Sequence, residues 1–195
     1  MNLFNTYGYL IITLFVMVET LGIPVPGETT LVAGAIYAAI NPTKFSIYLV
    51  ILFAIIGAVI GDNIGYSIGK KYGKGVINKI ENILKTNKNY VQSTEKFFEK
   101  YGFKAVFWGR FVSILRMFIP TTAGIHKLEY KKFFLYNLLG GISWAILYGT
   151  VGFIFGTNIP FILKMLHDIT LTTILIIVII VIFYIIKKKW KILKI

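Results

Sequence analysis

Long apolar blocks alternate along this chain with short segments rich in lysine, glycine or proline. Residues 45–69 and 133–156 are each long enough to cross a bilayer, which takes about 20 apolar residues in one helix. Residues 160–186 form a third block of this kind and lead into the basic tail 187–195. The pattern predicts an all-α polytopic membrane protein that forms a single membrane domain over residues 1–195.

Another apolar block, residues 9–40, is broken in its middle. The segment I-P-V-P-G-E follows soon after Glu19, and proline ends a helix because it lacks the backbone N–H group. Each half is therefore too short to cross a bilayer. We expect a re-entrant helical hairpin, which enters and leaves the membrane on one side, with Glu19 and Glu28 near the midplane. Irregular backbone at that depth is tolerated where it is buried in protein or lines a cavity.

The block at residues 102–126 repeats this design with arginines in place of carboxylates. We expect residues 102–118 to enter the membrane, Pro120 to break the helix, and the segment T-T-A-G-I to return. Arg110 and Arg116 then also lie deep in the bilayer. Two residues that are six positions apart on one helix point about 120° away from each other. The guanidinium groups of the two arginines therefore converge only if the helix unwinds toward Pro120 or if the bound group is large.

The hairpins and the spans that follow them predict an inverted repeat. Residues 9–69 form the first unit, and residues 102–156 form a second unit of opposite orientation. Secondary transporters place their binding sites near the midplane between such repeats. Glycines in both spans predict faces on which another helix packs closely, within the chain or in a homodimer. They are Gly57, Gly61, Gly65 and Gly69 in the first span, and Gly140, Gly141, Gly149, Gly152 and Gly156 in the second.

Charge follows the division between membrane and water. Hydrophobic residues make up 56% of the chain, charged residues make up 15%, and the formal net charge is +13. Most lysines flank the apolar blocks, so membrane topology explains the charge better than nucleic-acid binding. Segment 70–101 is predicted to form amphipathic helices that lie in the headgroup region of the membrane. The positive-inside rule places the loop 70–104 and the C-terminus in the cytoplasm.

Five charged residues lie away from the ends of the hairpins 9–40 and 102–126 and of the span 45–69, at depths where an uncompensated charge costs about 3 kcal/mol or more. They are Glu19, Glu28, Asp62, Arg110 and Arg116. The two arginines are candidates for binding an anionic group, because guanidinium groups form bidentate, charge-assisted hydrogen bonds with phosphate. Glu19 and Glu28, desolvated beside that group, are candidates for proton exchange. Asp62 serves either in proton coupling or as a structural hydrogen-bond partner.

Four motifs in this order resemble the DedA family, also called the SNARE-associated or VTT-domain family. They are E-x-x-G-I-P-V-P-G-E at residues 19–28, G-D-x-x-G-Y-x-I-G at 61–69, G-R-F-x-x-x-x-R-x-x-x-P-x-x-A-G at 109–124, and F-x-x-x-N-x-x-G-x-x-x-W at 133–144. The resemblance covers about residues 9–157. The combination of motifs is specific, whereas each motif alone is weak.

The resemblance implies a bacterial inner-membrane protein with two facing re-entrant hairpins. Members of the family are implicated in returning undecaprenyl phosphate across the membrane, in membrane homeostasis that depends on the proton-motive force, and, in eukaryotic relatives, in phospholipid scrambling. The functional acids of the family fall on Glu19 and Glu28, and its functional arginines fall on Arg110 and Arg116. Asp62 matches the G-D motif. Ser113 stands where many members have proline, a departure at the tip of the second hairpin.

The alternatives belong to other function classes. A lipid phosphatase needs a nucleophile beside the arginines, and the candidates Ser113, Thr121 and Thr122 have no well-placed histidine. His126 and His167 lack a companion at metal-ligand spacing, so we expect no metal, no cofactor and no enzymatic activity. A phospholipid scramblase remains, as does a non-transporting membrane-homeostasis protein whose buried charges pair with one another. With no cysteine, thiol catalysis is excluded.

Overall fold

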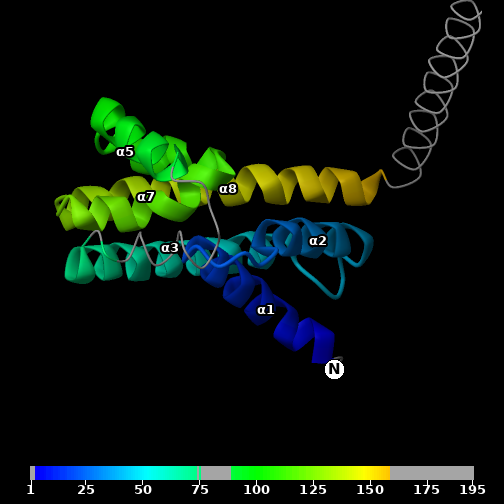
Figure 1. Cartoon of the computed structure of the whole chain (residues 1–195). Coiled ribbons are helices and arrows are strands. Elements are labelled where there is room, and N and C mark those ends of the chain that lie inside the picture. Colours follow the sequence, from blue (N-terminus) through cyan, green and yellow to red (C-terminus); the bar gives the residue numbers. More distant parts are fainter. Residues whose placement is uncertain (1–2, 74, 76–88, 159–195) are drawn as a thin grey trace, which may run out of the picture. The chain divides into compact units, whose positions relative to one another are not determined.

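The computed structural model describes residues 3–73, 75 and 89–158, and every regular element in these ranges is a helix (Figure 1). In chain order the elements are α1 (Leu3–Thr20), α2 (Gly27–Ile40), α3 (Ile47–Tyr72), α5 (Asn89–Tyr101), α6 (Lys104–Trp108), the 3-10 turn η1 (Gly109–Phe111), α7 (Ser113–Ile125) and α8 (Tyr130–Thr157). The predicted span 160–186, the tail 187–195 and residues 76–88 of the predicted amphipathic loop lie outside the described residues. The all-α prediction is confirmed for the described part of the chain.

The two longest helices, α3 and α8, are long and apolar enough to cross a membrane by length and composition. They contain 26 and 28 residues. At about 1.5 Å per residue, both are longer than the hydrocarbon layer, which is about 30 Å thick. Only 33% of the most apolar part of each helix is buried within the protein. The outward sides carry exposed apolar side chains such as Leu52 and Ile56 on α3 and Leu139 and Leu147 on α8.

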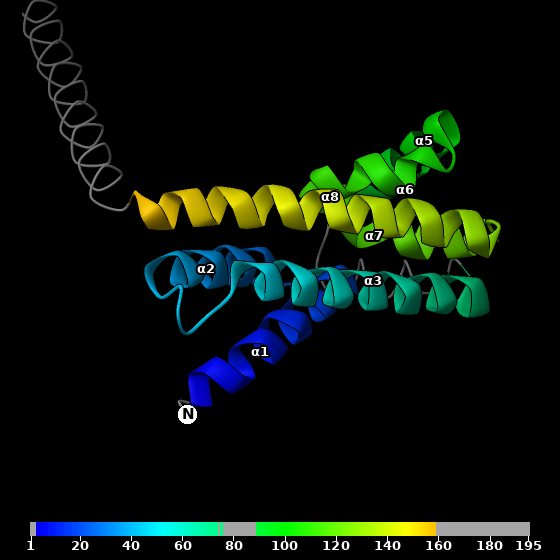
Figure 2. The ribbon, with the colours of Figure 1, turned by 180° about the vertical axis from the view of Figure 1, so that it is seen from behind.

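Helices α1 and α2 form a hairpin. Residues 21–26 join them, and Figures 1 and 2 both show the two helices running from this turn toward the same side. The predicted break at the proline-rich segment is therefore confirmed. Gly27 lets the start of α2 approach α1, because a Cβ atom there would lie 2.8 Å from the carbonyl oxygen of Phe15. The hydroxyl group of Thr13 donates a hydrogen bond to the carbonyl oxygen of Phe53, 3.0 Å away, and so ties α1 to α3.

The second broken segment is interrupted at Val112, and the predicted break at Ile119-Pro120 is wrong. Val112 has an extended backbone (φ −115°, ψ 110°) and separates η1 from α7. Helix α7 then continues through Pro120. A proline removes one backbone hydrogen bond, but helices in an apolar, packed environment tolerate it. Pro120 packs against Gly65 of α3, where a Cβ atom would lie 3.3 Å from the Pro120 Cβ atom. The missing side chain on α3 makes room for the proline ring.

Each long helix packs against limbs of both broken segments through its glycines. On α3, the first two glycines face α1 and the last two face α7. On α8, the first two glycines face α6 and η1, the middle one faces α3, and the last two face α2. In this order they are Gly57, Gly61, Gly65 and Gly69 on α3, and Gly140, Gly141, Gly149, Gly152 and Gly156 on α8. The predicted packing faces are therefore confirmed within one chain. A homodimer stays a prediction, and it would need another surface.

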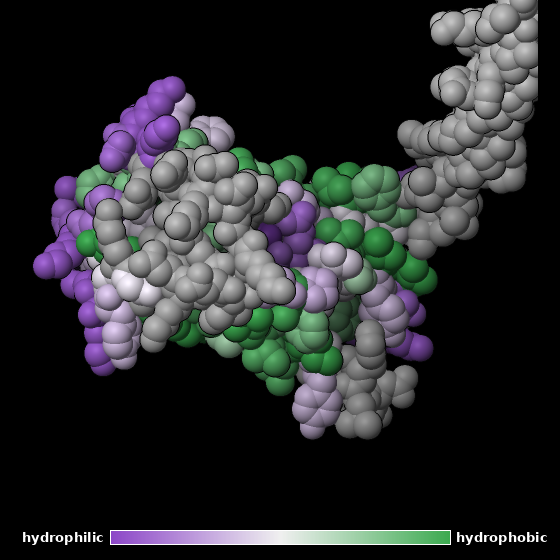
Figure 3. Space-filling model, in the orientation of Figure 1, coloured by the Kyte–Doolittle hydropathy of each residue, from purple (hydrophilic) through white to green (hydrophobic). Residues whose placement is uncertain are grey.

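Two hydrophobic clusters fill the space between the helices. One includes Val16 of α1, Leu31 of α2 and Trp144 of α8. The other includes Phe98 of α5 and Ile119 of α7. Figure 3 shows hydrophilic residues gathered around α5 and hydrophobic residues along α8. This division agrees with an apolar body that carries its polar helix at one end.

Gly69→Ala should lower the thermal stability of the purified protein in detergent. The added Cβ atom would lie 2.9 Å from the carbonyl carbon of Thr121, and overpacking of this kind costs about 1–3 kcal/mol. Gly75→Ala is the matched control, because nothing lies within 4 Å of a Cβ atom there. Equal unfolding temperatures for the two variants would contradict the close contact between α3 and α7.

Candidate functional site

Arg110 of η1 lies between α3 and α8 and has a polar partner on each. Its Nη2 group donates hydrogen bonds to Asp62 Oδ2 on α3 and to Asn137 Oδ1 on α8. The exposed fractions are 3% for Arg110, 2% for Asp62 and 0% for Asn137. A buried charge persists only where an opposite charge or hydrogen bonds compensate it. Arg110 is therefore the donor that a membrane-embedded Asp62 requires.

Arg116 of α7 reaches the first hairpin. Its Nη2 group donates hydrogen bonds to Glu19 Oε1 at 2.8 Å and to Glu28 Oε2 at 3.2 Å. The Arg116 side chain is 3% exposed, whereas those of Glu19 and Glu28 are 17% and 30% exposed. The guanidinium group also lies over the ring of Trp144, with Cζ 5.0 Å from the ring centroid, in a cation–π arrangement. The structure thus brings one predicted arginine together with both predicted acids of the first hairpin.

Glu19 also sets the geometry of the first hairpin. Its Oε2 atom accepts a hydrogen bond from the backbone N–H group of Glu28 at 2.9 Å. The first N–H groups of a helix have no partner within the helix and lie at its positive end, where a carboxylate is favourable. Pro26 precedes α2 and makes no side-chain cap. Glu19 therefore closes the turn onto α2 with one oxygen and binds Arg116 with the other.

The two arginines lie against neighbouring turns of α8. A Cβ atom at Gly141 would lie 3.6 Å from Arg110 Cζ, and Arg116 lies over Trp144, the third residue after Gly141. Three residues span roughly 4.5 Å along a helix. Unwinding toward Pro120, one of the two conditions for convergence considered from the sequence, does not occur; the extended residue Val112 separates η1 from α7 instead. This break allows arginines six positions apart to reach one face of α8.

Unpaired hydrogen-bond donors lie on these arginines and on two residues of α8 beside them. Among the described residues, the buried side-chain nitrogens without a partner are Arg110 Nε, Arg110 Nη1, Arg116 Nε, Asn137 Nδ2 and Trp144 Nε1. The corresponding unpaired oxygens are Asp62 Oδ1 and Thr122 Oγ1. Because a buried donor without a partner costs about 1–3 kcal/mol, the site is short of acceptors. An anion with several oxygen atoms would supply such acceptors.

Three residues of α8 complete this site, although the sequence assigned them no role: Asn137, Trp144 and Tyr148. Tyr148 lies close enough to Glu28 to interact with its carboxylate group. Spacings of seven and four residues place the three side chains on one face of a helix. That polar and aromatic periodicity, next to the paired glycines of α8, was the signal available in the sequence.

The residues considered for catalysis have other surroundings. His126 ends α7, and its ring stacks on Phe98 of α5 with the centroids 5.8 Å apart. Thr121 and Thr122 are buried on α7, while His167 and the side chain of Ser113 lie outside the described residues. Within residues 3–73, 75 and 89–158, no group of three or more histidine, aspartate or glutamate side chains is placed to hold a metal ion.

Comparisons with known proteins agree with these features. The VTT domain matches residues 25–163. Protein DedA of Escherichia coli is 28% identical over 159 residues, which cover 79% of this chain and 71% of DedA. An uncharacterized membrane protein of Mycobacterium tuberculosis is 38% identical over 142 residues, which cover 70% of this chain and 64% of that protein. One from Synechocystis is 29% identical over 155 residues, or 80% and 70% of the two chains. No solved structure matches the chain.

Asp62→Leu should destabilise the protein by about 3–5 kcal/mol, because it leaves Arg110 as a buried charge without its counterion. Arg110→Met should destabilise the protein by a similar amount, because it leaves Asp62 as a buried charge without its counterion. The double variant should recover most of the loss, since apolar replacement of both partners is often close to neutral. Thermal unfolding of the purified variants in one detergent measures these effects. Fully additive losses in the double variant would show that the two residues are not coupled.

Proposed function

Since this chain belongs to the DedA family of VTT-domain membrane proteins, we propose that it moves a phosphate-bearing lipid between the leaflets of the bacterial plasma membrane, with undecaprenyl phosphate as the substrate. The observation that carries the proposal is the cluster of unpaired donors around Arg110 and Arg116. A phosphate headgroup has the oxygen acceptors that these donors lack and a charge opposite to that of the arginines. The isoprenoid tail stays in lipid throughout, so only the headgroup has to cross the hydrocarbon.

The proposal includes two re-entrant hairpins arranged as an inverted repeat. Helices α2 and α7 have 14 and 13 residues, fewer than the ~20 that a span requires. The glycine face of α3 contacts α1 of the first hairpin along one part and α7 of the second along the other. The glycine face of α8 contacts α6 and α2 in the same way. Each limb then reaches the middle of the bilayer from one side. The lysine-rich loop 70–104 and the C-terminus are assigned to the cytoplasm by the positive-inside rule.

Two acids hold the arginine that a phosphate would bind. Protonation of Glu19 or Glu28 removes the charge that attracts Arg116 and frees its guanidinium group for an anionic headgroup. Glu28 is the more exposed of the two acids, so we assign proton exchange first to Glu28. The headgroup thus replaces the ionised acid as the partner of Arg116 while that acid holds a proton, which avoids an uncompensated charge at any stage.

Arg110 plays a different part in this mechanism. It keeps its bonds to Asp62 and Asn137 through Nη2, while its Nε and Nη1 groups are available to a headgroup. Asp62 then acts by positioning Arg110. A direct part for Asp62 in proton coupling stays a prediction from the sequence.

Arg116→Ala should abolish the movement of undecaprenyl phosphate between the leaflets of proteoliposomes. The variant lacks the guanidinium group that exchanges between acids and headgroup, and a leaflet-resolved assay measures its rate. Lys132→Ala is the control, because Lys132 is an exposed cation paired with Glu129 at the surface. Size-exclusion chromatography and circular dichroism establish that both variants fold. Unaltered transport by folded Arg116→Ala protein rejects the proposal.

Glu28→Gln should make transport less dependent on pH. In the wild type, lower pH should favour headgroup binding, because a protonated carboxyl no longer competes for Arg116. Glutamine imitates that neutral state at every pH. Rates at two pH values in the same proteoliposomes provide the measurement, with Glu129→Gln at the exposed surface as the control. A wild-type pH dependence in Glu28→Gln protein contradicts the assigned proton exchange.

The ion pairs themselves favour a second function, that of a non-transporting membrane-homeostasis protein. Each arginine already has a carboxylate partner, so the charges could serve only to hold the helices together. A charge-swapped variant, Asp62→Arg with Arg110→Asp, that kept full activity in cells would favour this function.

In the transport assay, equal movement of ordinary phospholipids would indicate a scramblase. Release of inorganic phosphate from lipid phosphates would indicate a phosphatase.

A further inference from the structure

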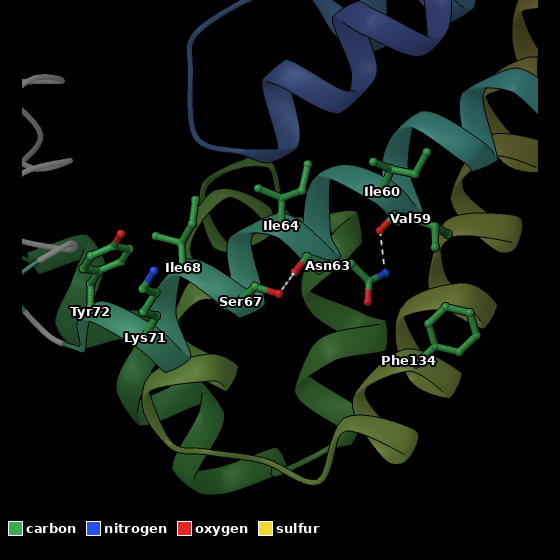
Figure 4. Close-up of a pocket in the computed structure, with 9 residues that line it drawn as sticks. All are labelled: Val59, Ile60, Asn63, Ile64, Ser67, Ile68, Lys71, Tyr72 and Phe134. Carbon is green, nitrogen blue, oxygen red and sulfur yellow. Dashed lines mark hydrogen bonds between the residues drawn. The ribbon is translucent and has the colours of Figure 1, made fainter.

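A groove on the outer side of α3, next to α8, lies apart from the arginine cluster. Its volume is about 600 Å³. Figure 4 shows that its wall is formed by the C-terminal part of α3, with Phe134 of α8 on the other side. Ile60, Ile64 and Ile68 supply the apolar lining from α3. Exposed apolar surface with this shape on a membrane protein faces lipid.

The groove has one charged end. Lys71 and Tyr72 line it in the last turn of α3, and the Lys71 ammonium group lies 5.3 Å from the centroid of the Tyr72 ring. No carboxylate of the described residues forms an ion pair with Lys71. From Ile60 to Lys71 the helix rises roughly 16 Å, close to half of the ~30 Å hydrocarbon layer. The groove therefore has the length of one leaflet, with its cation at headgroup depth.

The two uncharged polar residues between the apolar wall and its charged end, Asn63 and Ser67, form hydrogen bonds within the protein. Asn63 donates to the carbonyl oxygen of Val59 at 2.7 Å and accepts a hydrogen bond from the Tyr130 hydroxyl group at 2.9 Å. Ser67 donates to the carbonyl oxygen of Asn63 at 2.8 Å. Figure 4 shows the bonds of Asn63 and Ser67 to the α3 backbone. With these groups paired, the wall suits a hydrocarbon chain better than water.

Val59 brings the groove close to the buried arginine. Val59 lines the groove. A Cβ atom at Gly141 would lie 3.5 Å from Val59 Cγ2 and 3.6 Å from both Cζ and Nη1 of Arg110. Val59 and the guanidinium group therefore meet at the same point on α8. Arg110 Nη1 is one of the unpaired donors of the site.

We propose that this groove is a lateral docking site for one anionic lipid, which rests there before its headgroup passes Val59 to reach Arg110. The phosphate lies at Lys71, and the tail lies along the three isoleucines and Phe134. Free phosphate does not fit this role, because it has no tail to occupy the apolar wall. The docking site is the first step of the substrate path in the proposed lipid translocation, and the proposal of this site rests on that function.

The test uses the full-length protein in phosphatidylcholine nanodiscs with a small fraction of a photo-crosslinking lipid. Phosphatidic acid and phosphatidylcholine, each with a photoreactive group in the acyl chain, are compared at equal mole fraction. We expect phosphatidic acid to label residues 59–72 and Phe134 several-fold more than phosphatidylcholine does. Lys71→Gln should bring this ratio close to one. Ile64→Trp should reduce labelling by filling the groove, whereas Ile146→Trp, at an exposed position of α8 outside the groove, should not.

Equal labelling by the two lipids, or an unchanged ratio in Lys71→Gln protein, overturns the docking of an anionic headgroup. Undiminished labelling in Ile64→Trp protein overturns the groove as the site. Val59→Phe should slow translocation without reducing the labelling, and an unchanged rate overturns the path past Val59. Preferential labelling without any lipid movement by the wild type leaves the docking site standing and refutes the translocase. Lipid movement without preferential labelling refutes the docking site and leaves the translocase standing.

Discussion

Compensation of buried charge is the constraint on which this structure depends. Arg110 and Arg116 are almost fully enclosed between apolar helices, and each lies within hydrogen-bonding distance of a carboxylate from another helix. Removing one partner of such a pair leaves a charge that costs several kcal/mol. The positions of η1 between α3 and α8, and of α7 against the turn of the first hairpin, follow from this requirement.

Glycine makes the compensation geometrically feasible. Asp62 has a short side chain, and it reaches Arg110 because the helices approach closely where side chains are absent. Gly61 beside it admits the backbone of α1, and Gly140 and Gly141 admit η1. The ion pairs and the close packing therefore depend on each other. The same closeness buries both arginines, so a group that takes the place of the acids has to bring its own negative charge.

Several features were predictable from the sequence because they are local. A run of about 20 apolar residues predicts a spanning helix whatever surrounds it. The segment I-P-V-P-G-E ends a helix through the chemistry of proline, and the structure has the break there. Charged residues within apolar segments are recognisable from the sequence as candidates for a functional site. The order of the motifs also indicated the family, which the match to residues 25–163 confirms.

The pairing of the charges and the break in the second hairpin were decided only by the tertiary structure. Pro120 lies within a continuous helix because Gly65 of another helix makes room for its ring, and Val112 provides the break instead. Arg110 and Asp62 are 48 positions apart, and Arg116 and Glu19 are 97 positions apart. Periodicity and composition describe residues within one helix, so they cannot state which helix another one meets. Partner choice at this site is a property of helix packing.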